Sequence, residues 1–273
     1  MRQDILNLEV SCPLAIEPIM SKLSDQVVLV TGSSRGLGLA TARAFQAEGA
    51  RVVLNCRGKD SLPKTEAIAK ELGGIAIAAD VTDKEQVAAL FDQAASHFGQ
   101  PISVVVNNAL ADYQFNGDGR KKLDSIEWED FDKQIRVAVQ GALNTTKAAI
   151  SGFEKLGRGR IINIGSNLVQ NPVVPYQDYC AAKGALLAFT RSMAAELGPK
   201  NITVNLVAGG LLKGTDASSA TPKAVFDQIA AVTPLRKVTS THDLAGAVLF
   251  FASPWASAIT GQQVIVDGGL VMS

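Results

Sequence analysis

The chain has 273 residues, of which 47% are apolar and 5% aromatic, and its 26 basic residues balance 26 acidic ones. This length and composition suit one large α/β domain with a buried sheet, and the balanced charge gives no electrostatic reason to expect nucleic acid or an anionic membrane surface as partner. Two histidines and three scattered cysteines argue against a metal site and favour a reducing, cytoplasmic setting.

The beginning of the chain does not have the pattern of a targeting signal. Asp4, Glu9 and Glu17 interrupt any apolar core, and no small-residue cleavage site follows one. We therefore expect residues 1–22 to be an N-terminal extension and residues 23–273 to form the domain.

Short β-branched runs alternate with helical patterns along the rest of the chain. The expected strands are 27–30, 51–55, 75–78, 102–106, 160–164, 203–207 and 264–266. Apolar residues at three- and four-residue spacing predict helices between them, including 37–48, 84–98, 128–150 and 176–197. Such alternation implies right-handed βαβ crossovers, and hence an α/β fold with a doubly wound parallel sheet.

Two segments depart from this alternation. Residues 110–127 are polar and contain glycine, and residues 209–233 form the second irregular stretch. Both follow the carboxyl ends of strands, where ligands bind in open α/β sheets, so we expect them to be substrate-shaping loops. The uncharged run 244–266 is divided by Pro254 and Gly261, which favours a buried helix, a turn and a strand over a membrane span.

A glycine-rich turn, T-G-S-S-R-G-L-G at 31–38, joins the first strand to the first helix. Glycines permit a tight turn and close backbone approach to a pyrophosphate, and the helix start supplies free N–H groups. Alone, such a turn could as well be an ordinary one. Its position in an alternating chain favours a dinucleotide site.

Ser166, Tyr179 and Lys183 have the spacing of a carbonyl-reducing site. Tyr179 and Lys183 lie four residues apart in an expected helix, so both side chains share a face. A neighbouring cation lowers a tyrosine pKa from about 10, which would make Tyr179 a general acid. Ser166 follows a strand and could donate a hydrogen bond to the same oxygen. The alternative is a packed ring beside a solvated charge.

These motifs together resemble the short-chain dehydrogenase/reductase family over roughly residues 23–270. The matching residues are the glycine turn, Asp80-Val81, Asn107-Asn108-Ala109, Ser166, Tyr179-x-x-x-Lys183 and Val266-Asp267-Gly268-Gly269. Within the family the chain is most similar to the 3-oxoacyl-[acyl-carrier-protein] reductases. The resemblance implies one Rossmann-type domain of about seven strands in the order 3-2-1-4-5-6-7, with three helices on each face, assembled as a homotetramer or a dimer.

The resemblance also implies roles for single residues. Tyr179 would donate the proton, Lys183 would hold the nicotinamide ribose, and Ser166 would orient the carbonyl. Asp80 and Val81 would meet the adenine, although Asp80 could instead cap the helix that follows. The remaining expected cofactor contacts are Gly32, Ser34, Arg35, Gly36, Leu37, Gly38, Arg57, Asn108, Ala109, Gly210 and Leu212.

The end of the second strand favours NADP(H) over NAD(H). Cys56 stands where an acidic residue would bind an unphosphorylated ribose, and Arg57 follows it. Arg35 could converge with Arg57 on a 2′-phosphate. The alternative is that both are solvated surface arginines.

The sequence departs from the family pattern at three places. Leu110 replaces the usual glycine after N-N-A, and Gly209-Gly210 replaces P-G, which would loosen the loop over the cofactor. Ala138 stands where an asparagine commonly anchors a water in the proton relay.

The substrate expected from the resemblance is a 3-oxoacyl thioester, small or bound to an acidic carrier protein. Arg120-Lys121-Lys122 and Lys213 are then candidates for a basic docking surface, the alternative being a solvated loop. Another alcohol or ketone, such as a sugar or a steroid, remains open as substrate. So does a weakly active dinucleotide-binding sensor.

Overall fold

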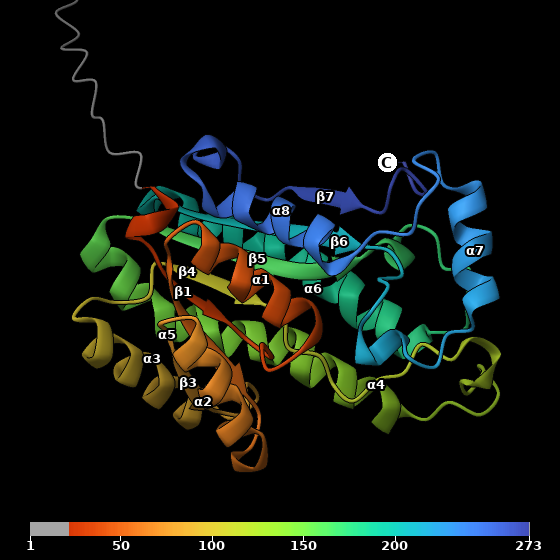
Figure 1. The fold of residues 1–273 in the computed structure, drawn as a ribbon, viewed down its shortest axis with the longest axis horizontal. Helices are drawn as coiled ribbons and strands as arrows, with labels where there is room; N and C mark the ends of the chain where they lie inside the picture. Colours follow the sequence, from red (N-terminus) through yellow and green to blue (C-terminus); the bar gives the residue numbers. More distant parts are fainter. Residues whose placement is uncertain (1–21, 273) are drawn as a thin grey trace, which may run out of the picture.

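A computed structural model of the protein describes residues 22–272 and contains a seven-stranded, wholly parallel sheet (Figure 1). Its order, β3-β2-β1-β4-β5-β6-β7, is the one predicted. The strands are β1 Val27–Val30, β2 Arg51–Cys56, β3 Ile75–Ala78, β4 Val104–Asn107, β5 Gly159–Ser166, β6 Ile202–Gly209 and β7 Gln263–Val266. The strand order has its topological switch point between β1 and β4: β2 and β3 are added on one side of β1, and β4 to β7 on the other. The connections leave these neighbouring strands on opposite faces of the sheet, which opens a crevice at their carboxyl ends.

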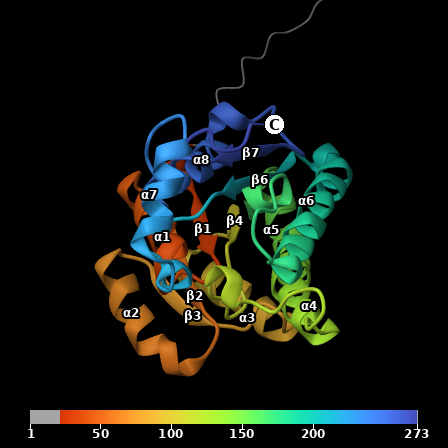
Figure 2. The same ribbon diagram turned by 90° about the vertical axis from the view of Figure 1, so that its right-hand side faces the viewer.

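Helices cover both faces of this sheet. Their bounds are α1 Gly36–Ala47, α2 Leu62–Glu71, α3 Lys84–Phe98, α4 Trp128–Ile135, α5 Gly141–Leu156, α6 Gln177–Leu197, α7 Lys223–Val232 and α8 Thr241–Ala252. Figures 1 and 2 show α1, α2 and α8 on one side of the strands and α3, α5 and α6 on the other. This confirms the predicted doubly wound arrangement.

Two apolar cores, one on each face, hold the layers together. Val27 and Leu29 point into the core that contains Phe153, on the side of α3, α5 and α6. Val28 and Val30 point into the opposite core, which contains Phe251 of α8. Because successive strand residues face opposite layers and both layers are covered, β1 is a continuous apolar run with no alternation.

The predicted helix 128–150 is divided. A π-helical turn, Arg136–Gln140, lies between α4 and α5 and contains Ala138. Such turns widen the backbone ring to an i→i+5 bond and often occur at functional sites. The sequence analysis predicted one continuous helix over 128–150 and did not detect this turn.

The two irregular segments lie at the same end of the molecule. Residues 110–127 connect β4 to α4, and residues 209–233 contain the helix α7, which the sequence prediction missed (Figure 2). Among residues 22–272, every helix is too short or too polar to cross a bilayer. The expected N-terminal extension falls almost wholly outside the described residues, so this boundary stays a prediction.

Candidate active site

A cavity of about 1310 Å³ opens at the carboxyl ends of the strands. It brings together every residue predicted to bind the cofactor, along with Tyr179 and Lys183. The predicted residues that line it are Gly32, Ser34, Arg35, Gly36, Leu37, Gly38, Arg57, Asp80, Val81, Asn108, Ala109, Tyr179, Lys183, Gly210 and Leu212. Ser166 is buried and is not among the residues that line this cavity.

The glycine turn is packed too closely for larger residues. A Cβ on Gly38 would lie 2.5 Å from the carbonyl oxygen of Gly32 and 2.6 Å from Asn108 Nδ2. Gly32 itself has φ +61°, in the left-handed region, with its Cβ position 3.0 Å from Ala109 Cα. The turn therefore brings bare backbone to the start of α1, where free N–H groups favour a phosphate.

Two buried polar residues that the sequence analysis missed hold this turn. Asn55 accepts a hydrogen bond from Gly32 N at 3.1 Å, and its amide donates to Ala79 O at 3.0 Å. Thr31 Oγ1 accepts from the N–H groups of Asn108 and Ala109, at 2.9 and 3.0 Å. Polar residues within apolar strands were the available signal, because buried polar groups need partners.

Asn108 and Asp80 each form hydrogen bonds within the protein. Asn108 Nδ2 donates to Thr31 O at 2.8 Å, which ties the end of β4 to the glycine turn. Asp80 Oδ1 accepts from the backbone and hydroxyl of Thr82, at 2.9 and 2.7 Å. The cap of α3 is Asp83, which accepts from two N–H groups of the first turn. The alternative that Asp80 caps this helix is therefore wrong.

Both candidate phosphate-binding arginines line the cavity and are exposed. Arg35 forms an ion pair of 3.0 Å with Asp216, and Arg57 forms one of 3.3 Å with Asp112. Each carboxylate belongs to one of the two irregular segments. Exposed pairs of this kind contribute little to stability, so both guanidinium groups can exchange partners.

Lys183 is buried beside Tyr179 and donates from Nζ to the carbonyl oxygen of Ile164 at 2.7 Å. Burial lowers the pKa of Lys183 to about 8. Its ammonium nitrogen lies 5.7 Å from the centroid of the Tyr179 ring, so it approaches the π-face.

The pKa of Tyr179 differs from the sequence prediction. Burial raises the pKa of Tyr179 to about 12, and a hydrogen bond with Ser166 opposes this rise. The expected fall caused by Lys183 is wrong for this structure, because the lysine bonds to a backbone carbonyl and both side chains are desolvated. The sequence argument considered the neighbouring charge and left out burial.

Ala138 lies beside the lysine, as the alignment of motifs predicted. It lines a small cavity of about 10 Å³ together with Lys183 and Asn107. This volume is near the ~10–15 Å³ that one water needs, and both neighbours are polar. With alanine at this position, a small void lined by both polar and apolar residues lies next to the lysine.

Aromatic rings that the sequence analysis missed surround Tyr179. Tyr113, Phe115 and Tyr176 form a cluster with it, and the ring centroids of Tyr113 and Tyr179 are 5.1 Å apart. The available signal was the presence of two aromatic side chains in the otherwise polar segment 110–127.

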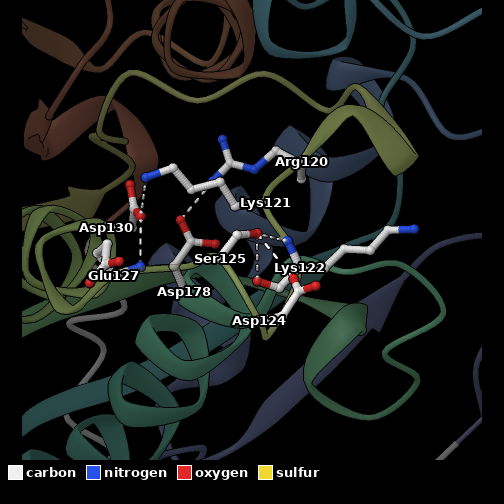
Figure 3. Close-up of polar contacts among 8 residues, drawn as sticks. All are labelled: Arg120, Lys121, Lys122, Asp124, Ser125, Glu127, Asp130 and Asp178. Atoms are coloured by element: carbon white, nitrogen blue, oxygen red, sulfur yellow. Dashed lines mark hydrogen bonds and ion pairs between the residues drawn. The ribbon is translucent and has the colours of Figure 1, made fainter.

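The candidate basic docking surface is largely neutralised (Figure 3). Arg120 forms an ion pair of 2.8 Å with the buried Asp178, and Lys121 forms one of 2.7 Å with Asp130. Arg120 and Lys121 therefore have carboxylate partners within the chain. These ion pairs lower the positive charge that the segment presents, and the docking role of Arg120-Lys121-Lys122 and of Lys213 stays a prediction.

Comparison with known proteins gives one consistent family. Residues 32–271 match the family described as Enoyl-(Acyl carrier protein) reductase. The chain is 36% identical to the 3-oxoacyl-[acyl-carrier-protein] reductase FabG of Pseudomonas aeruginosa, over 92% of this chain and 99% of that protein. It is 31% identical to the 7alpha-hydroxysteroid dehydrogenase of Escherichia coli, over 91% and 95% of the two chains.

A solved structure shares the fold and some sequence. It is a blue fluorescent protein from a metagenomic library in complex with NADPH, 32% identical, with a TM-score of 0.79 over 92% of this chain and all of that one. The sheet order, the glycine cradle and these relatives agree. The chain belongs to the short-chain dehydrogenase/reductase family, whose members are oxidoreductases that use a nicotinamide dinucleotide.

Proposed function

We propose that this protein is an NADP(H)-dependent reductase that transfers hydride between nicotinamide and a carbonyl carbon or secondary alcohol. The observation that carries the proposal is that the glycine turn, Tyr179 and Lys183 all line the same cavity. The close packing at Gly32 and Gly38 fits a pyrophosphate against bare backbone. When bound there, the nicotinamide would supply the hydride.

The residues of the chain would manage the oxygen of the substrate. Tyr179 would give its phenolic proton to the carbonyl oxygen as negative charge develops on it. Ser166, which already bonds to Tyr179, would fix the direction of that hydroxyl. Lys183 would hold the nicotinamide ribose and stabilise the tyrosinate after transfer, and the small void beside it could admit a water for reprotonation.

NADP(H) is the proposed form of the cofactor. Arg35 and Arg57 line the adenosine end of the cavity, and β2 ends at Cys56 with no carboxylate to bind the ribose hydroxyls. Steady-state kcat/KM should be higher with NADPH than with NADH. An equal or higher value with NADH would contradict the assignment.

The proposed substrate is a 3-oxoacyl thioester, small or linked to an acyl carrier protein, as in fatty-acid synthesis. Support comes from the similarity to the FabG of Pseudomonas aeruginosa. The similarity to a hydroxysteroid dehydrogenase keeps a ring-shaped ketone or alcohol as the second candidate. A panel of acetoacetyl thioesters and free ketones, followed by NADPH absorbance, would distinguish them.

Tyr179→Phe tests the enzyme against a non-catalytic dinucleotide sensor. The variant should lose carbonyl reduction by about 10²–10⁴-fold, the usual contribution of a general acid, and should still bind NADPH. Fluorescence titration of NADPH measures the binding, and Leu143→Ala on α5 provides a control at an exposed residue that does not line the cavity. Undiminished turnover in Tyr179→Phe would refute the proton-donor role.

A cytoplasmic homotetramer is the proposed setting. Trp128 at the start of α4 is 68% exposed and stacks on Phe131, and Trp255 after α8 is 77% exposed. Large exposed rings of this kind favour burial between subunits. Light scattering after size exclusion would measure the mass, and a monomer at micromolar concentration would contradict the proposal.

A further inference from the structure

Two aromatic rings from the segment 110–127 lie directly on the proposed proton donor. Tyr113, only 7% exposed, tilts over the Tyr179 ring at a centroid distance of 5.1 Å. Phe115 meets the same ring edge-on at 5.4 Å. Tyr113, Phe115 and Tyr179 all line the large cavity, so these rings form one wall of the space through which a carbonyl would reach Tyr179.

An ion pair fixes this wall to the helix that carries Tyr179. Arg120 Nη2 lies 2.8 Å from Asp178 Oδ2, and the Asp178 side chain is 2% exposed (Figure 3). Asp178 directly precedes Tyr179 in α6. The Arg120 guanidinium also lies 4.1 Å from the centroid of the Tyr113 ring, and the Tyr113 hydroxyl donates to Asp178 Oδ1 at 3.4 Å.

The ion pair of Arg120 and Asp178 contacts Tyr113 at two places. The guanidinium packs on its ring face, and the carboxylate accepts from its hydroxyl. Because Asp178 is almost fully buried, loss of Arg120 would leave an uncompensated buried carboxylate and would also remove the group that packs on the face of the Tyr113 ring. The position of the Tyr113 ring therefore depends on Arg120.

Phe115 is held by the other irregular segment. Its backbone N–H donates to Ala217 O at 2.8 Å, and Thr221 Oγ1 donates to its carbonyl at 2.9 Å. The Gly117 N–H donates to the hydroxyl of Tyr176, another ring of the cluster, at 2.7 Å. Backbone contacts thus place Phe115, whereas the side-chain pair places Tyr113.

We propose that Arg120 and Asp178 are positioning residues that hold the Tyr113 ring against Tyr179, where Tyr113 and Phe115 together form a wall that makes the site select carbonyl substrates by bulk. Substrates with an unbranched chain beside the carbonyl fit along the wall, whereas branched or bicyclic ketones collide with the two rings. This inference rests on the proposed reductase function and deepens it, since it names the shape of the accepted substrate.

The test compares Arg120→Gln with wild type on two substrates. One is an acetoacetyl thioester, and the other is a bicyclic ketone. We expect the ratio of kcat/KM for the first over the second to fall at least about tenfold in the variant, the discrimination that shape in an apolar pocket supplies. The change should appear mainly in KM for the bicyclic ketone, and NADPH affinity by fluorescence titration should stay within about twofold.

Lys121→Gln is the matched control, because it removes a cation from the next position in the same segment and breaks the exposed pair with Asp130. Its substrate ratio should equal that of wild type. Asp178→Asn should shift the ratio as Arg120→Gln does. Arg120→Lys keeps the charge and should restore the ratio in part.

Phe115→Ala tests the wall itself if an ion-pair variant does not fold, since it shortens the wall and leaves the pair intact. An unchanged ratio in folded, NADPH-binding Arg120→Gln, or in folded, NADPH-binding Phe115→Ala, overturns the inference and leaves the reductase function standing. A wild-type protein that binds NADPH but reduces neither substrate overturns the reductase function itself.

Discussion

Gly38→Ala should weaken both the fold and cofactor binding, although alanine favours helices. The new Cβ would lie 2.5 Å from Gly32 O, 2.6 Å from Asn108 Nδ2 and 2.9 Å from Ser33 Cα. Two of these atoms are backbone, so the glycine turn must shift to relieve the contact. Asn108 Nδ2 bonds to Thr31 O and Gly32 O, at 2.8 and 3.1 Å, and would shift with it.

Two opposing contributions set the magnitude. Replacing glycine by alanine inside a helix gains about 0.5–1 kcal/mol, while overpacking a close contact costs about 1–3 kcal/mol. We expect a net loss of about 1–2 kcal/mol in the free energy of unfolding by urea. Because the displaced backbone is the proposed phosphate cradle, the Kd for NADPH should rise about tenfold, equivalent to about 1.4 kcal/mol.

Gly246→Ala is the matched control. Gly246 is exposed in the middle of α8, and no atom lies within 4 Å of its Cβ position. Only the helix preference acts there, so the free energy of unfolding should rise by about 0.5–1 kcal/mol with NADPH affinity unchanged. The reasoning is refuted if Gly38→Ala is as stable as wild type and binds NADPH within twofold of it.

Two further predictions concern single side chains. Lys183 has a pKa of about 8 when folded, against a usual 10.5, so between these pH values the lysine binds more protons in the unfolded chain. Its contribution to stability should therefore rise with pH there by up to about 3 kcal/mol, while the raised pKa of Cys180 opposes this rise above pH 9. Lys183→Met should remove that rise in urea titrations at pH 7, 8.5 and 10, and a rise that persists would assign it to other groups. Ser240 accepts from Asp243 N at 3.2 Å and begins α8 in a capping box, so Ser240→Ala should lower the free energy of unfolding by about 1 kcal/mol. No change in the urea midpoint would show that the cap contributes nothing.

The sheet and the nucleotide turn could be predicted because their signals are local. β1 is a four-residue apolar run followed at once by the glycine turn, and both features depend on neighbouring residues. The spacing of Tyr179 and Lys183 is set by one helix, so their shared face also follows from sequence. The order of the strands came from the family resemblance, since local patterns do not define which strands pair.

The substrate wall could not be predicted because its contacts are long-range. Arg120 and Asp178 are separated by 58 positions, and nothing in the sequence around either residue indicates its partner. The same limit explains the reversed pKa shift of Tyr179. A neighbouring lysine is visible in sequence, whereas the burial of both side chains depends on the whole fold.

The partners of the two candidate phosphate-binding arginines lead to a last prediction. Arg57 lies 3.3 Å from Asp112, and both side chains are largely exposed. If a 2′-phosphate binds Arg57, it must compete with that carboxylate and is also repelled by it. Removing the charge with Asp112→Asn should therefore lower the Kd for NADPH by about two- to fivefold, within the 0.2–1 kcal/mol of an exposed pair.

NADH is the internal reference for this variant, because it lacks the phosphate and its Kd should not change. Asp132→Asn is the control, since Asp132 pairs with Arg136 one helical turn away and neither residue lines the cavity. Added salt should reduce the gain in NADPH affinity, as it screens exposed charges. An equal gain for NADH would show that Asp112 acts on the shape of the cavity, and an unchanged Kd for NADPH would remove Arg57 from the proposed phosphate site.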